Sequence, residues 1–164
     1  MPNHCMNKLN IYALNAKRLE EVLSGVAGKE DQENEAELLS FDSITPTPPE
    51  MLNGKKEYVK FPDWYEFRLT NWGTKWNPYD IILDKKDTLA IFSFDTAWSP
   101  PIPIIAKLIE KYPDVTFVLY YLEPGNSFAG YYDGTADEVY EGPSREYYDM
   151  ALSQFGWERE EMEA

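Results

Sequence analysis

Two short segments gather the side chains best suited to binding a ligand. Residues 71–77, Asn-Trp-Gly-Thr-Lys-Trp-Asn, place two tryptophans around a glycine, a hydroxyl and a lysine. Residues 94–101, Phe-Asp-Thr-Ala-Trp-Ser-Pro-Pro, end an apolar run and lead into a predicted helix, whose N-terminal amides favour anions. We expect the two segments to meet. The candidate ligand-binding residues are Trp72, Thr74, Lys75, Trp76, Asp95, Thr96, Trp98 and Glu123.

A purely structural interpretation of the same residues competes with a pocket. Large aromatic side chains serve packing first, so the tryptophans would cover the sheet. Asp95 would then bond Lys75 or backbone amides, and Ser99 would cap the following helix. This interpretation is the one that the residue types favour.

Metal and catalytic chemistry have little support in the sequence. His4 is the single histidine and Cys5 the single cysteine, and neighbours on a strand point to opposite faces. Cys5 is therefore expected to be a small buried hydrophobe. Asp95 and Glu123 form the one plausible acid/base pair, but such pairs are common in an acidic chain. No catalytic residue, metal or cofactor is predicted, and we expect a protein that is not an enzyme.

The charge balance narrows the class of partner. The chain has 15 Lys and Arg against 29 Asp and Glu, a net charge of −14, which repels nucleic acid. A single cysteine fits a reducing compartment, and neither a secretion signal nor a membrane span is recognisable, so we expect a cytoplasmic protein. The acidity serves solubility or, alternatively, imitates phosphates toward a basic protein that binds nucleic acid.

The spacing of apolar residues predicts an α+β domain. Strands are expected at 8–13, 38–44, 79–83, 88–94, 115–122 and 128–132, and helices at 16–27, 64–72, 99–112 and 144–155. In order they contain the β-α-β-β-α-β series of a ferredoxin-like sandwich. We expect residues 1–142 to form this domain, with an insertion at about 45–77 between its second and third strands and an extra C-terminal hairpin. Residues 143–164 would be an extension with a short helix and a solvated, frayed acidic tail.

Four stretches together resemble a known family. They are Met1–Asn7, Asn71–Trp76, Asp95–Pro101 and Tyr121–Gly125, with a proline-rich stretch before the middle two. The chain is similar over most of residues 1–133 to the YubB-like proteins of plasmids, phages and bacteria. The resemblance implies a ferredoxin-like fold and carries no agreed activity.

The leading hypothesis is a non-enzymatic protein-binding module of mobile-element origin, whose acidic surface engages a basic host protein. The alternative is a small-molecule or nucleotide-binding domain, with a hydrolase among the options, that has a tryptophan-rich pocket. A third hypothesis is a structural module whose exposed aromatics form an oligomer interface. No direct contact with nucleic acid or membrane is expected.

Overall fold

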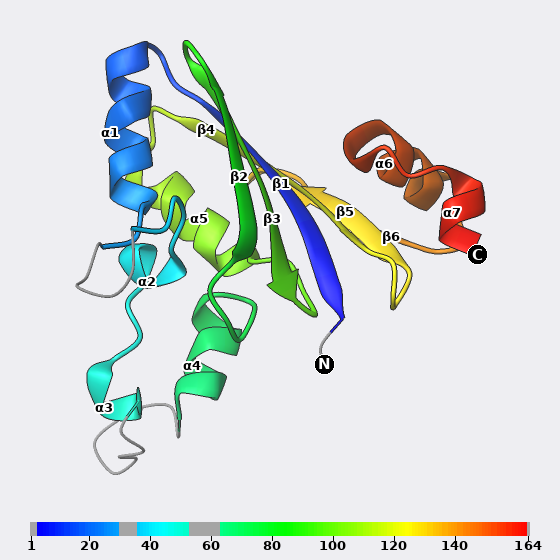
Figure 1. Ribbon diagram of the computed structural model, residues 1–164, viewed down its shortest axis with the longest axis horizontal. Helices are drawn as coiled ribbons and strands as arrows, with labels where there is room; N and C mark the ends of the chain where they lie inside the picture. The colour runs from blue at the N-terminus through cyan, green and yellow to red at the C-terminus, as the bar shows by residue number, and fades with distance from the viewer. Residues whose placement is uncertain (1–2, 30–35, 53–62, 164) are drawn as a thin grey trace.

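A six-stranded antiparallel sheet organises the molecule (Figure 1). The computed structural model describes residues 3–29, 36–52 and 63–163. The strand order across the sheet is β2-β3-β1-β4-β5-β6, and neighbouring strands pair antiparallel. The strands are β1 His4–Tyr12, β2 Tyr79–Lys86, β3 Leu89–Ala97, β4 Thr116–Glu123, β5 Phe128–Tyr132 and β6 Asp137–Glu141.

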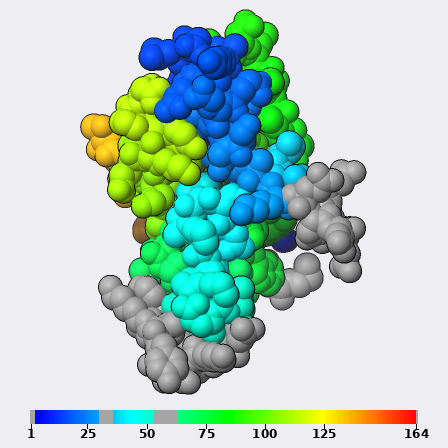
Figure 2. Space-filling model, turned by 90° about the vertical axis from the view of Figure 1, so that its left-hand side faces the viewer, coloured from blue at the N-terminus to red at the C-terminus, as the bar shows by residue number. Residues whose placement is uncertain are grey.

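Helices cover the two faces of this sheet unequally. Helices α1 (Ala16–Val26) and α5 (Ile102–Lys111) lie on one face, together with α2 (Phe41–Ile44). Figure 2 views that side, with α1 in blue at the top, α5 in yellow-green and the insertion in cyan below. The opposite face carries α6 (Arg145–Phe155), followed by α7 (Arg159–Glu163).

The predicted β-α-β-β-α-β series is present, with one correction to its second strand. The series runs β1-α1-β2-β3-α5-β4, with strand order β2-β3-β1-β4. The strand predicted at 38–44 is wrong, because Phe41–Ile44 forms the short helix α2. Phe41 and Ile44 are both buried at helical spacing, and the Phe41 amide donates to the side chain of Asn77. The insertion therefore lies between α1 and β2, not between the second and third strands.

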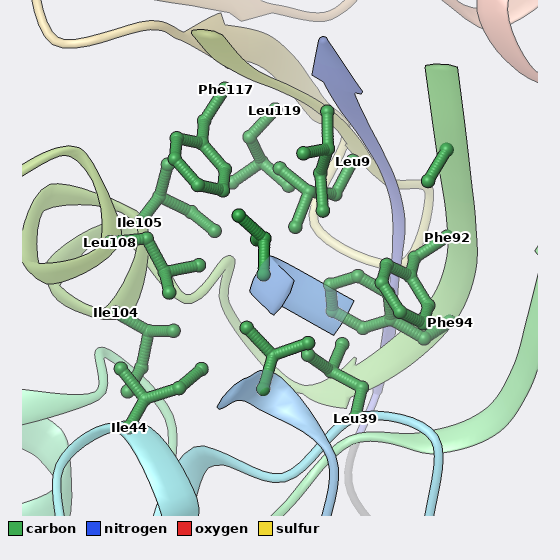
Figure 3. Close-up of a cluster of buried hydrophobic side chains, with 14 of the residues drawn as sticks. Leu9, Leu39, Ile44, Phe92, Phe94, Ile104, Ile105, Leu108, Phe117 and Leu119 are labelled. Carbon is green, nitrogen blue, oxygen red and sulfur yellow. The ribbon is translucent and has the colours of Figure 1, made fainter. Parts of the chain in front are cut away.

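The main core lies between the sheet and helices α1 and α5 (Figure 3). Alternate residues of β1, including Leu9 and Ile11, point into it, and Phe92 and Phe94 of β3 do the same. Helix α5 contributes its stripe of Ile104, Ile105 and Leu108. A second apolar cluster lies on the opposite face, between α6 and strands β4 to β6.

The helix predictions hold best where the apolar period is strongest. Asn15 caps α1, and Ser144 caps α6 by accepting from the Tyr147 amide at 3.2 Å. The predicted cap of α5 is wrong: the helix begins after Pro101, and Ser99 instead donates to the carbonyl of Gly73. The tail expected to fray forms α7, and β6 was not predicted.

Short helices α3 (Pro49–Leu52) and α4 (Trp64–Asn71) belong to the insertion, of which residues 53–62 lie outside the described ranges. Helix α4 confirms the predicted helix at 64–72. Within the described part of the chain, no helix has the length and apolar content that a membrane crossing demands.

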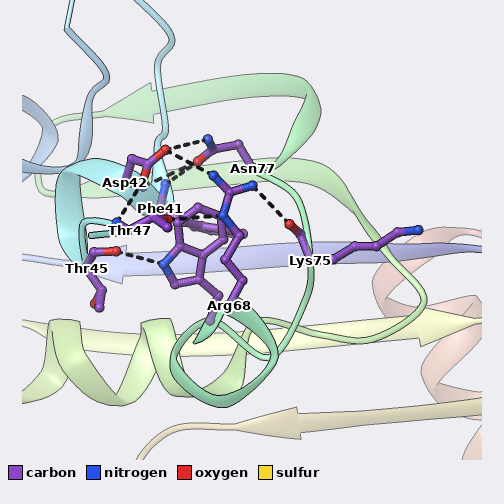
Figure 4. A network of polar contacts seen from close by, with 8 residues as sticks. Phe41, Asp42, Thr45, Thr47, Arg68, Lys75 and Asn77 are labelled. Atoms are coloured by element: carbon purple, nitrogen blue, oxygen red, sulfur yellow. Dashed lines mark hydrogen bonds and ion pairs between the residues drawn. The ribbon is translucent and has the colours of Figure 1, made fainter. Parts of the chain in front are cut away.

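Arg68 of α4 ties the insertion to the domain (Figure 4). Its guanidinium donates to Thr47 Oγ1 at 3.1 Å and to the Lys75 carbonyl at 3.2 Å, and lies 3.8 Å from Asp42 Oδ2. The same group stacks over the ring of Trp72 at 4.4 Å. Burial lowers the pKa of Arg68, and Asp42 opposes that shift.

We expect Arg68→Met to lower the free energy of unfolding by about 1–3 kcal/mol, because partly buried acceptors lose their donor. Urea unfolding followed by tryptophan fluorescence measures the change. Arg145→Met is the matched control: this side chain is 89% exposed and its loss should cost under about 0.5 kcal/mol. Equal effects of the two substitutions would show that Arg68 does not hold the insertion.

Candidate functional site

The two segments singled out in the sequence do meet, and their hydroxyls hold them together. Thr74 Oγ1 donates to the Ala97 carbonyl at 2.8 Å, and Ser99 Oγ donates to the Gly73 carbonyl at 2.5 Å. Thr96 Oγ1 donates to the Ser99 carbonyl at 2.7 Å. Thr74 and Thr96 are fully buried, so these predicted ligand-binding hydroxyls serve backbone carbonyls of the junction.

The junction also explains the glycine between the two tryptophans. Gly73 has φ +84°, in the left-handed region, and a Cβ there would lie 2.8 Å from the Pro100 carbonyl oxygen and from Pro103 Cδ. Only glycine fits both constraints. Its presence therefore reflects close packing of the loop on the start of α5.

The three tryptophans do not act together as the walls of one pocket. Trp72 is fully buried, packs edge-to-face on Phe41 and donates from Nε1 to the Thr45 carbonyl at 2.8 Å. Trp76 is 40% exposed and carries Lys75 Nζ 4.4 Å above its ring. Trp98 is 45% exposed. The buried ring of Trp72 is an anchor of the insertion and offers no surface to a ligand.

Glu123 is a structural carboxylate. It is fully buried at the end of β4, and its two oxygens accept from the amides of Gly125 and Asn126, each at 2.8 Å. A carboxylate with both oxygens bonded to backbone amides fixes the turn between β4 and β5. The sequence predicted Glu123 as a ligand-binding residue, whereas in the structure its carboxylate holds this turn.

Asp95 lies on the face of the sheet away from α1 and α5. It pairs with Met6 of β1 and with Tyr79 of β2, so its side chain lies beside theirs. Here a cavity of about 340 Å³ opens between the N-terminal end of β1 and Trp157, the second residue after α6. Its wall includes Asn3, His4, Met6, Asp95, Glu123 and Trp157. Asp95 and Glu123 are thus the two predicted residues that share a cavity wall.

A second hollow of about 220 Å³ continues from the first along the sheet. The two share Met6 and Asp95, and the second also includes Lys8, Asp80 and Gln154. Lys8 Nζ donates to Gln154 Oε1 at 3.1 Å, so this cation is held at the far end. The pair forms one groove across β2, β3 and β1, beside the C-terminal end of α6.

The Asp95 carboxylate has no hydrogen-bond or ion-pair partner among the described residues. Burial raises its pKa, the nearby charge of Asp80 raises it further, and His4 opposes both. The phenol of Tyr79 donates or accepts at 2.5 Å from His4 Nδ1, and its pKa is raised by burial and then by Asp95. The groove is therefore a place of negative potential.

Sequence reasoning missed His4, Tyr79, Asp80 and Trp157 as lining residues or near neighbours of this groove. Tyr79 reaches Asp95 through a β-bulge between Tyr79 and Ile82, which no residue pattern announces. Trp157 follows Gly156, which ends α6 with φ +70°. The available sequence signal for Trp157 was its position directly after a glycine that ends a predicted helix.

Cys5 is fully buried on the opposite face of β1 from His4, which confirms its predicted packing role. Burial raises the pKa of the thiol well above its usual range, and Glu123 and Asp95 add to this. Over residues 3–29, 36–52 and 63–163, no group of three or more His, Cys, Asp or Glu side chains is placed to hold a metal ion.

The fold and the groove define a small α+β protein with one face of its sheet covered by helices and the other partly open. The chain belongs to the family described as the ferredoxin-like domain in Api92-like protein, whose model matches residues 71–163. This match begins at the last residue of α4 and includes α6.

A solved structure agrees with the fold. The crystal structure of a protein Api92 from Yersinia pseudotuberculosis has a TM-score of 0.64, with 88% of this chain and 99% of that chain covered. The two sequences are 11% identical, so the similarity concerns the fold alone. The comparison with curated proteins finds no match.

We expect Asp95→Asn to stabilise the protein at neutral pH by less than about 1 kcal/mol, because it removes a partly buried charge that solvent still screens in part. The pKa of Asp95 is raised on folding, so the ionised carboxylate destabilises the folded protein. This destabilisation is absent below the unfolded pKa of about 3.9 and fully present above the folded pKa. The gain should therefore vanish at about pH 3, as thermal unfolding at the two pH values would measure.

Asp84→Asn is the control, because Asp84 is an exposed carboxylate of β2 that lines neither hollow. It should change the melting temperature little at either pH. A loss of stability of Asp95→Asn at neutral pH would reveal a partner for the carboxylate and contradict the unpaired state.

Proposed function

We propose that this protein is a non-enzymatic binding module that engages a basic protein through the acidic surface of its C-terminal part. The proposal rests on one observation. Between residues 133 and 163 lie ten acidic side chains and two arginines, so this stretch carries eight of the fourteen net negative charges. The acidic residues are Asp133, Asp137, Glu138, Glu141, Glu146, Asp149, Glu158, Glu160, Glu161 and Glu163.

The two arginines of this stretch leave most of the carboxylates uncompensated. Arg145 pairs with Asp149 at 3.6 Å and Arg159 with Glu163 at 2.9 Å. In the described ranges, the other eight acidic residues have no ion-pair partner. All of these eight except Asp133 are exposed. An acidic surface of this kind steers a basic protein to it and repels nucleic acid.

The same surface offers apolar area among its charges. A hollow of about 540 Å³ lies between α6 and α7, with Tyr148 and Leu152 on its wall. Leu152 is 49% exposed, and Val139 of the edge strand β6 is 56% exposed. Apolar groups ringed by charges are the usual composition of a protein interface, with the apolar part supplying affinity.

A small-molecule-binding domain is the second candidate, favoured by the 340 Å³ cavity. The Asp95 and Glu123 carboxylates on its wall oppose a phosphate, which counts against a nucleotide. The tryptophan-rich pocket on which this candidate rested loses Trp72 to the core. The mobile-element origin and YubB-like kinship expected from the sequence, and a place in the cytoplasm, remain part of the leading proposal.

Two variants of equal net charge test the acidic surface. One neutralises four acids within it, as Glu138→Gln, Glu141→Gln, Glu160→Gln and Glu161→Gln. The other neutralises four exposed acids elsewhere, as Glu37→Gln, Glu50→Gln, Asp87→Asn and Glu110→Gln. Each variant has a net charge of −10 in place of −14.

Tagged wild-type and variant proteins are used to capture partners from nuclease-treated bacterial lysate at about 0.1 M and about 1 M salt, where the Debye length is about 10 Å and about 3 Å. We expect the wild type and the second variant to retain a basic protein at low salt, and the first variant to lose most of it. Failure of the wild type to capture a basic protein, or an equal loss of capture in both variants, would contradict a specific acidic surface.

A further inference from the structure

The cavity beside Asp95 has the chemistry of a site for an organic cation. Asp95 lies on its wall as a partly buried carboxylate that has no hydrogen-bond or ion-pair partner among the described residues. Glu123, whose oxygens accept from two backbone amides, adds a second carboxylate. Asp80, on the adjoining hollow, raises the pKa of Asp95. A desolvated carboxylate without a partner is unfavourable, and a bound cation would offset that cost.

Trp157 provides an aromatic wall to the same cavity. Its backbone amide donates to the Ala151 carbonyl at 3.0 Å, so the residue is fixed at the end of α6. Trp64, Trp72 and Trp76 each have an arginine or lysine of this chain over the ring. In the described ranges, Trp157 has none. The residue is partly buried and packs against the apolar cluster under α6, and the part of it that lines the cavity is where a cation from outside would stack.

Within the described ranges, no lysine or arginine lines the cavity. Lys8 is bonded to Gln154 in the adjoining hollow and does not line the cavity wall itself. His4 is engaged with the Tyr79 hydroxyl through Nδ1. The acidic surface continues from the wall, since Glu158, Glu160 and Glu161 follow Trp157 directly. A basic partner seated on that surface could thus reach the cavity.

We propose that this cavity binds the guanidinium group of an arginine side chain of the basic partner, an inference that rests on the proposed function. The Asp95 carboxylate accepts hydrogen bonds from the planar fork, and the indole of Trp157 stacks on its face. Arginine fits this pairing better than lysine, because the guanidinium is planar, more weakly hydrated and able to bond and stack at once.

Three small probes test the chemistry of the cavity without the partner: the amides of N-acetyl-arginine, N-acetyl-lysine and N-acetyl-citrulline. Citrulline keeps the shape of arginine but carries no charge. Each is titrated into the isotopically labelled full chain, and the NMR signals of the Trp157 indole N–H and the His4 amide are followed. We expect saturable shifts with arginine, at least about threefold weaker binding of lysine, and no saturation with citrulline.

Asp95→Asn should weaken arginine binding at least about tenfold, while Asp84→Asn should leave it unchanged. Equal binding of citrulline, or unchanged binding by Asp95→Asn, would overturn the cation site. Because Asp95→Asn is expected to be at least as stable as the wild type, a loss of binding would not come from unfolding, and the melting temperature checks this.

A second arm separates this inference from the proposed function. Asp95→Asn should reduce capture of the basic partner by about tenfold, which Asp84→Asn should not. A partner held equally by both variants would overturn the arginine site and leave the acidic surface standing. Arginine amide binding with no captured protein would overturn the assignment to a partner's side chain and, with it, the proposed function.

Discussion

The antiparallel pairing of β1 with β3 and β4 determines which side chains face the core and which face the open side of the sheet. Its register sets Leu9 opposite Phe92 on one side and Leu119 on the other, which closes the core under α1 and α5. The same register sets Met6 opposite Asp95 and Leu122, on the other face. Since side chains alternate along a strand, a slip of one residue would exchange the two faces.

This alternation separates two neighbours that looked alike in the sequence. Thr96 points into the core, where its hydroxyl accepts from Asn7 and donates to the Ser99 carbonyl. Asp95, one residue earlier, points to the open face and reaches no donor in the part of the chain that the structure describes. Adjacent polar residues at a strand end therefore took opposite roles, one in the junction of two loops and one at a cavity.

The elements that could be predicted from the sequence are those whose signals lie within a few neighbouring residues. The helices at α1 and α6 followed from apolar spacing together with a capping Asn15 or Ser144, both within a few residues. The segment at 38–44 was predicted as a strand because its apolar residues are dense, but its conformation depends on Asn77, which lies far along the chain. Tertiary contacts of that kind override local propensity.

The spatial grouping of the candidate site residues could not be predicted from the sequence. Nothing in residues 71–77 says that Trp72 turns inward to meet Phe41 while Trp76 stays exposed under Lys75. Nor does the sequence say that Trp157 lies near Asp95, because α6 must first cross the sheet. The types of residue were predictable, whereas their grouping depended on how the insertion and the C-terminal helix pack.

The two carboxylates on the cavity wall differ in whether the fold explains their presence. Glu123 is the more buried, and its burial is offset by two backbone amides, so its position is explained by the turn alone. Asp95 is partly buried, no described residue donates a hydrogen bond to it, and its burial raises its pKa. Proteins keep features that cost stability mainly where activity or binding requires them. Packing does not explain why a carboxylate is present at position 95. A cation supplied by a partner would explain it, because the cation would pair with the carboxylate.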